Sequence, residues 1–343
     1  MPTIKDLARI AGVSIGTVSN VINNKSSVTE ESRRKVEEAI RLTDYKVNLH
    51  ARGMILKKSF NIGLVVPSIL DPFFPKLADV IEQECEKLDM NVILSSSNYS
   101  PDREIDKIEQ MLAKNVDGII LIPESDRNRS YVAGLLEKET PLVLLARRYN
   151  DLRAPYVVAD NRKTAEDGIN YLLGKGYDSI GFLVSPLMNT ADEDRLAGIQ
   201  NWKNNHSEAA VSIHYCAPLP VHDRKHSMEH QLSQGYEKGL ELIRDQRLPR
   251  AVFANNDYIA LGFMKACTES SIRLPDDVAL LGVSRQFPKE LLSTELSSFD
   301  PHSEIMGSEA VRILKELMDH PERGDESTHH IEIGMSLIEG MTT

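Results

Sequence analysis

The sequence has few cysteines and no long apolar segment, and both absences restrict the class of protein. Its 343 residues include three cysteines, placed far apart at Cys85, Cys216 and Cys267. Their number and spacing give no disulfide framework and fit a reducing cytosol. The longest apolar runs, such as residues 118–123 and 278–283, have the length of strands and are too short to span a membrane. The first residues are polar and lack the apolar core of a signal peptide, so we expect a soluble, cytoplasmic protein without a membrane partner.

Sequence signatures for cofactor chemistry are also missing. The Gly-Lys-Gly of residues 174–176 lacks the third glycine of a dinucleotide fingerprint, and no Gly-Lys-Ser/Thr phosphate loop is present. His222, His226 and His230 recur every four residues and could line one helix face as metal ligands, but the charged residues among them favour a solvated face. We therefore expect no enzyme, no cofactor and no bound metal.

Charge is distributed unevenly along the chain. The whole chain carries a net charge of −11, which alone argues against a nucleic-acid binder. Residues 1–58, however, hold eleven lysines and arginines and six acidic residues, a net charge of +5. The remainder holds 29 basic and 45 acidic residues and so carries −16. Because phosphates attract the basic part and repel the acidic part, the chain is predicted to approach DNA through its N-terminal end.

The pattern of apolar residues divides the chain into a short helical segment and a long segment of alternating strands and helices. Residues 3–44 predict three short helices, with a tight break at residues 11–13. From residue 60 onward, apolar strands alternate with amphipathic helices in two series, which predicts an α/β fold of two doubly wound parallel-sheet lobes. The predicted strands are residues 61–66, 91–96, 118–123, 142–147, 179–184, 211–216, 251–254 and 278–283, and the predicted helices are residues 74–88, 102–114, 162–175, 192–204, 227–245 and 257–271.

The spacing of small and apolar residues near the N-terminus predicts a helix-turn-helix. Ala8 lets the second helix pack closely, Gly12 permits the sharp turn, and Val18 anchors the second helix to the first. The start of the second helix would then enter the major groove, where Asn20 can pair with adenine and Ile15 can touch a thymine methyl group. A plain three-helix bundle with a solvated surface is the alternative. The candidate DNA-contacting residues of this segment are Thr3, Ser14, Ile15, Gly16, Thr17, Ser19, Asn20 and Asn23.

The full N-terminal sequence closely resembles the head of the LacI/GalR family of transcription regulators. The similar strings are TIKDLARIAGVS from Thr3, TVS from Thr17 and VIN from Val21, and the resemblance continues through most of the chain. It implies a bacterial regulator, a repressor or an activator, that binds near-palindromic double-stranded operator DNA as a homodimer and responds to a small-molecule effector. We favour a repressor.

The resemblance also implies how the chain is divided. A helix-turn-helix head would cover residues 1–46, a linker with a hinge helix that folds on operator DNA would cover residues 47–59, and a core would cover residues 60–343. In the linker, Asn48 and Ala51 are candidate DNA contacts, as is Met54. Met54 stands where the family usually has a leucine wedged into the minor groove.

Departures from the family pattern concern the head and the linker. Many members have arginine where this chain has Asn20, so the operator sequence is expected to differ. Many have proline where this chain has Val47, and Gly53 lowers the helix propensity of the hinge. Methionine at position 54 is also more flexible than leucine.

The resemblance implies a core like that of periplasmic binding proteins, with two lobes, a ligand cleft between them and three crossover segments. Loops at the carboxyl ends of parallel strands would face this cleft. The expected crossovers lie near residues 157–160, 284–287 and 299–301. The N lobe would contain residues 60–158 and 288–318, and the C lobe would contain residues 159–287 and 319–343.

Candidate effector-binding residues follow from the family's motifs. The aromatic pair Phe73 and Phe74 would pack on a sugar or base, and Arg195 is the arginine that commonly contacts the effector. Phe73 and Phe74 could instead belong to the core, and Asp257 could serve only as a helix cap. The full set of candidates is Asp71, Phe73, Phe74, Arg147, Arg195, Asn256, Asp257 and Arg285.

Two further departures bear on the effector. The family's strand-end Gly-Phe/Tyr-Asp-Asp is Gly-Val-Ser-Arg at residues 282–285, and the aspartate before Arg147 is Ala146. The loss of two acids and the gain of Arg285 suggest an anionic effector, such as a sugar acid or sugar phosphate, beside the sugars typical of the family. Alternatively, the pocket is degenerate and a protein corepressor acts on the outer surface of the core. A sugar-binding protein without a DNA role and a Rossmann-type enzyme are further alternatives.

Overall fold

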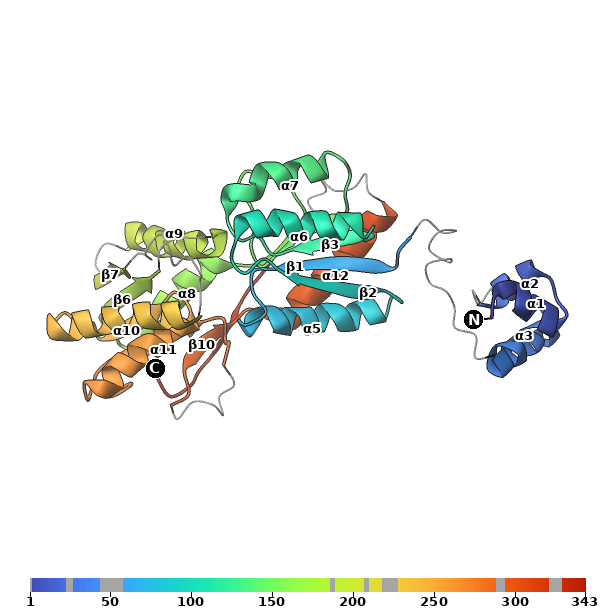
Figure 1. The fold of residues 1–343 in the computed structure, drawn as a ribbon. Helices are drawn as coiled ribbons and strands as arrows, with labels where there is room; N and C mark the ends of the chain where they lie inside the picture. The colour runs from blue at the N-terminus through green and yellow to red at the C-terminus, as the bar shows by residue number, and fades with distance from the viewer. Residues whose placement is uncertain are drawn as a thin grey trace. The chain divides into compact units, whose positions relative to one another are not determined.

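The computed structural model describes the chain in two compact units, residues Met1–Ser59 and Phe60–Thr343. Figure 1 shows the three helices of the first unit and the two layered lobes of the second. No helix among the described residues is long and apolar enough to cross a membrane. The described residues are 2–22, 27–43, 58–185, 189–206, 210–217, 228–287, 294–320 and 329–343.

The N-terminal unit is a three-helix head. Thr3 and Asp6 form a capping box at the start of the first helix, and Gly12 ends this helix with φ +64°. A side chain would be strained at that backbone conformation, which explains the glycine in the turn. The helices share a small core built on Leu7, Val18 and Val36, each fully buried. They are α1 (Ile4–Ala11), α2 (Ile15–Ile22) and α3 (Glu30–Thr43).

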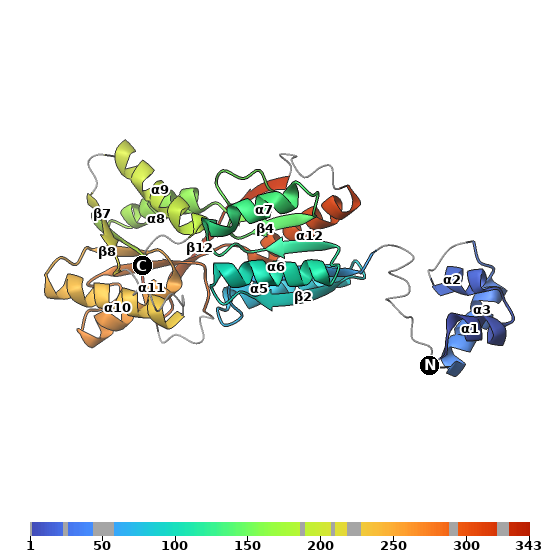
Figure 2. The same cartoon turned by 45° about the horizontal axis from the view of Figure 1, so that its top comes forward.

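The N lobe is built around a six-stranded sheet in which every pair of neighbouring strands is parallel. Apolar side chains on both faces bury the sheet between α5 and α12 on one side and α6 and α7 on the other (Figures 1 and 2). In sheet order the strands are β11 (His330–Ile333), β5 (Tyr156–Ala159), β4 (Leu142–Leu145), β3 (Gly118–Leu121), β1 (Asn61–Val66) and β2 (Asn91–Ser96). The helices are α5 (Phe73–Glu86), α6 (Pro101–Ala113), η1 (Asp126–Asn128), α7 (Arg129–Leu136) and α12 (Ser303–Asp319).

The C lobe repeats this architecture, with one antiparallel strand at its edge. One face of its sheet packs on α8 and α9, and the other packs on α11. In sheet order the strands are β12 (Ser336–Ile338), β10 (Ser297–Asp300), β9 (Ala279–Val283), β8 (Ala251–Ala254), β6 (Ser179–Val184) and β7 (Ala210–Tyr215). The helices are α8 (Asn161–Gly174), α9 (Thr190–Asn205), α10 (Met228–Arg244) and α11 (Asp257–Glu269). The α/β fold class with two doubly wound lobes is therefore confirmed.

One expected crossover and part of the lobe assignment were wrong. Residues 284–287 do not cross between lobes, because β9 and β10 on either side of this region pair with each other in the C-lobe sheet. The third crossover instead joins β11 to β12 at residues 334–335. Consequently, β10 belongs to the C lobe, and β11, which pairs with β5, belongs to the N lobe. The crossovers expected near residues 157–160 and 299–301 lie where β5 leads to α8 and β10 leads to α12.

Candidate functional site

A cavity opens between the two lobes of the second unit, at the carboxyl ends of the strands. Its empty volume is about 1030 Å³, a figure that includes the open mouth. A concave site of this kind, with aromatic and convergent polar side chains, suits a small molecule. The lining combines aromatic, amide and charged side chains from both lobes: Asp71, Phe73, Phe74, Tyr99, Glu124, Ala146, Arg147, Ala159, Asn161, Ser185, Asn189, Ala191, Asp192, Arg195, Gln231, Gln234, Asn256, Ser284, Gln286, Pro301, Met306 and Met335.

The first turn of α5 and the loop before it form the aromatic part of the wall. Asp71 accepts a hydrogen bond from the backbone N–H of Phe73 at 3.1 Å, which fixes the start of the helix. The rings of Phe73 and Phe74 meet edge to face with centroids 5.5 Å apart. Burial raises the pKa of Asp71. This wall gives a ligand an apolar surface with a polar group beside it.

A second part of the wall follows β3 and β4 and carries a charged pair. Arg147 donates from Nη1 to the carbonyl oxygen of Pro123 at 3.0 Å, and the same nitrogen lies 3.7 Å from Oε2 of Glu124. Glu124 is 4% exposed, and burial raises its pKa to about 7. The guanidinium of Arg147 also lies over the ring of Phe74, 5.8 Å from its centroid. Together these contacts hold an acidic and a basic side chain next to each other at the cavity wall.

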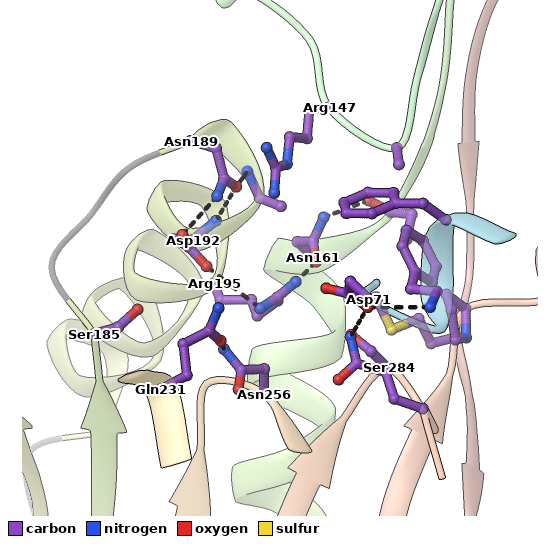
Figure 3. Close-up of a pocket in the computed structure, with 18 of the residues that line it drawn as sticks. Asp71, Arg147, Asn161, Ser185, Asn189, Asp192, Arg195, Gln231, Asn256 and Ser284 are labelled. Atoms are coloured by element: carbon purple, nitrogen blue, oxygen red, sulfur yellow. Dashed lines mark hydrogen bonds and ion pairs between the residues drawn. The ribbon is translucent and has the colours of Figure 1, made fainter. Parts of the chain in front are cut away.

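Helix α9 supplies the polar wall of the C lobe (Figure 3). Arg195 donates from Nε to Asn161 at 2.8 Å and from Nη1 to the carbonyl oxygen of Asn255 at 2.5 Å. Asp192 accepts hydrogen bonds from the side chains of Asn189 and Asn255, both at 2.7 Å. Burial lowers the pKa of Arg195. These contacts fix the guanidinium and the carboxylate within a buried network, so the wall is organised before any ligand binds.

Several contacts join the two lobes at one side of the cavity. The hydroxyl of Thr190 accepts from the backbone N–H of Arg148 at 3.1 Å and donates to its carbonyl oxygen at 2.9 Å. The Arg148 guanidinium donates to Asp194 at 2.5 Å, and the other carboxylate oxygen of Asp194 accepts from Arg162 at 2.8 Å. Asn150 donates to Glu193 at 3.3 Å. We call these six residues the interlobe latch.

Six of the eight effector-binding candidates line the cavity, and two do not. Asp71, Phe73, Phe74, Arg147, Arg195 and Asn256 line it. Asp257 lies outside the lining, because it is buried and accepts from the Ser298 hydroxyl at 2.7 Å and from the backbone N–H of Gln286 at 2.8 Å. Burial raises its pKa to about 7. Arg285 also lies outside the lining, with its Nε 4.0 Å from Asp300. Their role in effector binding therefore stays a prediction, and neither side chain lines this cavity.

Glu124, Asp192 and Tyr99 are among the polar lining residues that the sequence did not predict. Glu124 directly follows the predicted strand at residues 118–123, so the rule that strand ends face the cleft could have found it. Asp192 lies one helical turn before Arg195, on the same side of α9. Tyr99 follows β2 after an irregular turn and has no comparable signal in the sequence.

In the head, the candidate base-reading residues lie at the start of α2. Ser14, Ile15 and Gly16 are exposed, whereas Thr17, Ser19 and Asn20 are half-buried. Ser14 accepts a hydrogen bond from the backbone N–H of Thr17 at 3.0 Å and so caps the helix. Thr3 is exposed and caps α1. The remaining candidates, Asn23, Asn48, Ala51 and Met54, lie outside the described residues.

A family model for bacterial regulatory proteins of the lacI family matches residues 3–48, and a periplasmic binding protein-like domain model matches residues 169–343, half of the chain. The chain belongs to the LacI/GalR family. This LacI/GalR member is 29% identical over 321 residues to catabolite control protein A of Priestia megaterium, with 92% of each chain covered. It is 28% identical to the ribose operon repressor of Haemophilus influenzae, covering 94% and 93% of the two chains.

Solved structures of the family share the fold of this LacI/GalR chain. The lac repressor dimer bound to operator and an anti-inducer superimposes with a TM-score of 0.84 at 23% identity, covering 100% of this chain and 99% of that one. A complex of the regulator CelR with cellobiose gives a TM-score of 0.67 at 23% identity and full coverage of both chains. In the part of the LacI/GalR chain that the structure describes, no group of three His, Cys, Asp or Glu side chains is placed to hold a metal. His222 and His226 lie outside that part.

Proposed function

We propose that this LacI/GalR member is a sequence-specific, DNA-binding transcription regulator, a repressor, whose operator affinity is controlled by a small molecule bound between the core lobes. The observation that carries this proposal is the presence of two sites in one chain: an exposed helix-turn-helix surface and a polar, aromatic cavity between the lobes of the core. DNA as the target places its action in the cytoplasm. Relatives are named as transcriptional regulators and repressors, which supports a role other than catalysis.

The head contacts DNA through the start of α2. Exposed Ile15 and half-buried Asn20 offer an apolar group and an amide to base edges in the major groove. The capped N-terminus of α2 and the hydroxyls of Ser14 and Thr17 suit phosphate oxygens. The basic charge of residues 1–58 steers this end toward DNA.

The ligand of the cavity is a sugar-type molecule. Flat aromatic rings and buried groups that both donate and accept hydrogen bonds suit a compound with many hydroxyls. The sugar named in the ribose operon repressor and the cellobiose in the CelR complex belong to this chemical class. The expectation of an anionic effector rested partly on Arg285, which lies outside the cavity lining.

Helix α9 connects ligand binding to the arrangement of the lobes. One part of it presents Asp192 and Arg195 to the cavity, while Thr190 and Asp194 hold the N-lobe loop that contains Arg148. A ligand that binds more tightly to one lobe arrangement shifts the population toward it. That shift changes how the two linkers of a dimer present their heads to DNA.

Two chains pair through their cores, so that two heads meet the two halves of a near-palindromic operator. The described edge strand β2 of the N-lobe sheet presents Leu94, which is 44% exposed, and Leu70 in the loop after β1 is 73% exposed. An apolar edge of this kind is a liability in a monomer and is covered in an assembly. This edge is our candidate for part of the dimer contact.

The competing functions fit the observations less well. A sugar-binding protein without a DNA role has no use for the basic helix-turn-helix head. A degenerate pocket under the control of a protein corepressor does not explain a cavity whose Arg195, Asp192 and Asn161 are held in a buried hydrogen-bond network.

Selection of genomic DNA fragments by the purified protein tests the proposed function. We expect enrichment of a near-palindromic sequence, with affinity that falls steeply as salt rises. An Asn20→Ala variant, which removes a proposed base-reading side chain, should change the preferred base at one position of each half-site. Failure to enrich any sequence, at several salt concentrations and with or without sugars, would contradict operator recognition by this head.

A further inference from the structure

One acidic residue of the cavity has a buried oxygen that the protein leaves without a donor. Glu124 lines the cavity and is 4% exposed. Among the described residues, no group donates a hydrogen bond to its Oε2. Nη1 of Arg147 lies 3.7 Å away, which is beyond hydrogen-bond distance. A buried carboxylate oxygen in this situation lowers stability, and a donor brought by a ligand removes that cost.

The other two acids at the cavity wall already have donors. Asp71 accepts from the backbone N–H of Phe73 at 3.1 Å and from the side chain of Gln286 at 3.4 Å. Asp192 accepts from Asn189 and Asn255, each at 2.7 Å. Glu124 therefore differs from both in offering a buried, unused acceptor to a ligand.

The position of Glu124 is fixed from behind by a second buried acid. Its backbone N–H donates to Oε2 of Glu104 at 2.7 Å, and Oε1 of Glu104 accepts from Asn128 at 2.8 Å. Arg147 donates to the carbonyl oxygens of Pro123 and Glu124, at 3.0 and 3.4 Å. Because both sides of the peptide are held, the carboxylate is in place before a ligand arrives.

The pairing of Glu124 with Arg147 selects among ligand groups. A hydroxyl can donate to the carboxylate and accept from the guanidinium at the same time. A phosphate or carboxylate would face the negative charge of Glu124, and an ammonium would face the positive charge of Arg147. An uncharged hydroxyl therefore suits both members of the pair.

We propose that Glu124 is a specificity-determining residue of this regulator, which binds a neutral sugar through a hydroxyl at this wall and discriminates against the acid and phosphate forms of that sugar. The inference rests on the proposed function in one respect, namely that the cavity is the ligand site. It replaces the expectation of an anionic effector drawn from the sequence.

Calorimetric titration of the full-length protein at pH 8 tests the inference. The probes are ribose, glucose, galactose, mannose and cellobiose, and the acid or phosphate form of each sugar. We expect at least one neutral sugar to bind, and its charged forms to bind at least 10-fold more weakly. Glu124→Gln should lower the affinity for the neutral sugar by about 10- to 100-fold, the loss expected for a hydrogen bond to a charged group. It should also reduce the difference in affinity between the neutral sugar and its charged forms. Glu124→Asp, which keeps the charge, should retain part of the affinity.

The control is Glu137→Gln, an exposed acid of the same lobe outside the cavity lining, which should bind like the wild type. The inference is overturned if no neutral sugar binds, if charged forms bind more tightly, or if Glu124→Gln binds the neutral sugar as well as the wild type does. The DNA-fragment selection, run without sugar, separates the two proposals. An enriched operator together with failed titrations would contradict the sugar specificity assigned to the cavity and to Glu124 and would leave the DNA-binding role standing. Glu124-dependent sugar binding without an operator would contradict only the DNA-binding role.

Discussion

Glu124 makes the folded protein less stable at neutral and alkaline pH. Burial raises its pKa from 4.5 to about 7, although Arg147 opposes this effect, and Glu104 of α6 and Asp192 of α9 add to it. Between these two pH values the folded state binds more protons than the unfolded state, so stability falls as pH rises. A pKa shift of this size lowers the free energy of unfolding by about 3 kcal/mol. The loss develops between pH 4.5 and 7 and stays constant at higher pH.

Glu124→Gln should remove this part of the pH dependence. We expect the variant to be more stable than the wild type at pH 8, and the difference to shrink toward pH 4.5. Urea unfolding of full-length protein, followed by circular dichroism across this range, measures both curves. Glu104, whose pKa burial also raises, is present in both proteins. If the free energy of unfolding changed with pH in the same way in both proteins, ionisation of Glu124 would have no effect on stability.

At the scale of single residues, family motifs predicted which residues stand near the cavity better than they predicted the direction of each side chain. Phe73, Phe74 and Arg195 were placed in the cavity because they match family motifs, and they line it. Asp257 also matches a motif, but its carboxylate is turned to Ser298 and Gln286. The direction of a side chain depends on partners far along the chain, 41 and 29 residues away here, and local patterns do not contain that information.

At the scale of elements, the interlobe latch ties α9 to the loop after β4. Asp194 is 4% exposed and binds Arg148 of the N lobe and Arg162 of α8. Removing Arg148 leaves this carboxylate with one partner. Because the carboxylate is buried, the loss should destabilise the arrangement in which the lobes are joined by about 1–3 kcal/mol. Arg148→Ala should therefore populate a more open core.

Distances between spin labels can measure this opening. Labels on cysteines introduced at the exposed positions Gln110 of α6 and Glu237 of α10 report on the two lobes, and the three native cysteines are buried. We expect Arg148→Ala to broaden the distance distribution and lengthen its mean. Arg129→Ala, which removes an exposed pair with Asp151 within the N lobe, should leave it unchanged. An unaltered distribution in Arg148→Ala would mean that the latch does not hold the lobes.

The sequence predicted the strands that are continuous apolar runs and missed strands β5, β10, β11 and β12. Strands with continuous apolar runs, such as β1 and β6, stand where the pattern placed them, at Asn61–Val66 and Ser179–Val184. Strands β11 and β12 contain four and three residues and pair with partners far away in the chain. Their pairing is decided by tertiary contacts, which is why the third crossover was misplaced.

At the scale of the whole molecule, DNA affinity depends on joining two heads. Each head offers one short recognition helix, and its buried core is small. A single head therefore binds weakly, and the second head of a dimer binds at a high effective concentration once the first is in place. A substitution that separates the cores of the two chains should therefore reduce operator affinity, although the residues of the head are unchanged.

Leu94→Lys provides that change. A lysine on the outer edge of β2 places a charge in the proposed core contact, so we expect the protein to sediment as a monomer and to bind its selected operator at least 100-fold more weakly. Sugar binding should persist, since Leu94 lies outside the cavity lining. The matched control is Tyr215→Lys, because Tyr215 is 54% exposed on β7, the edge strand at the corresponding end of the other sheet. Analytical ultracentrifugation and operator titration measure the two effects. A Leu94→Lys protein that remains a dimer would move the core contact to another face, whereas a monomer with full operator affinity would mean that one head is enough.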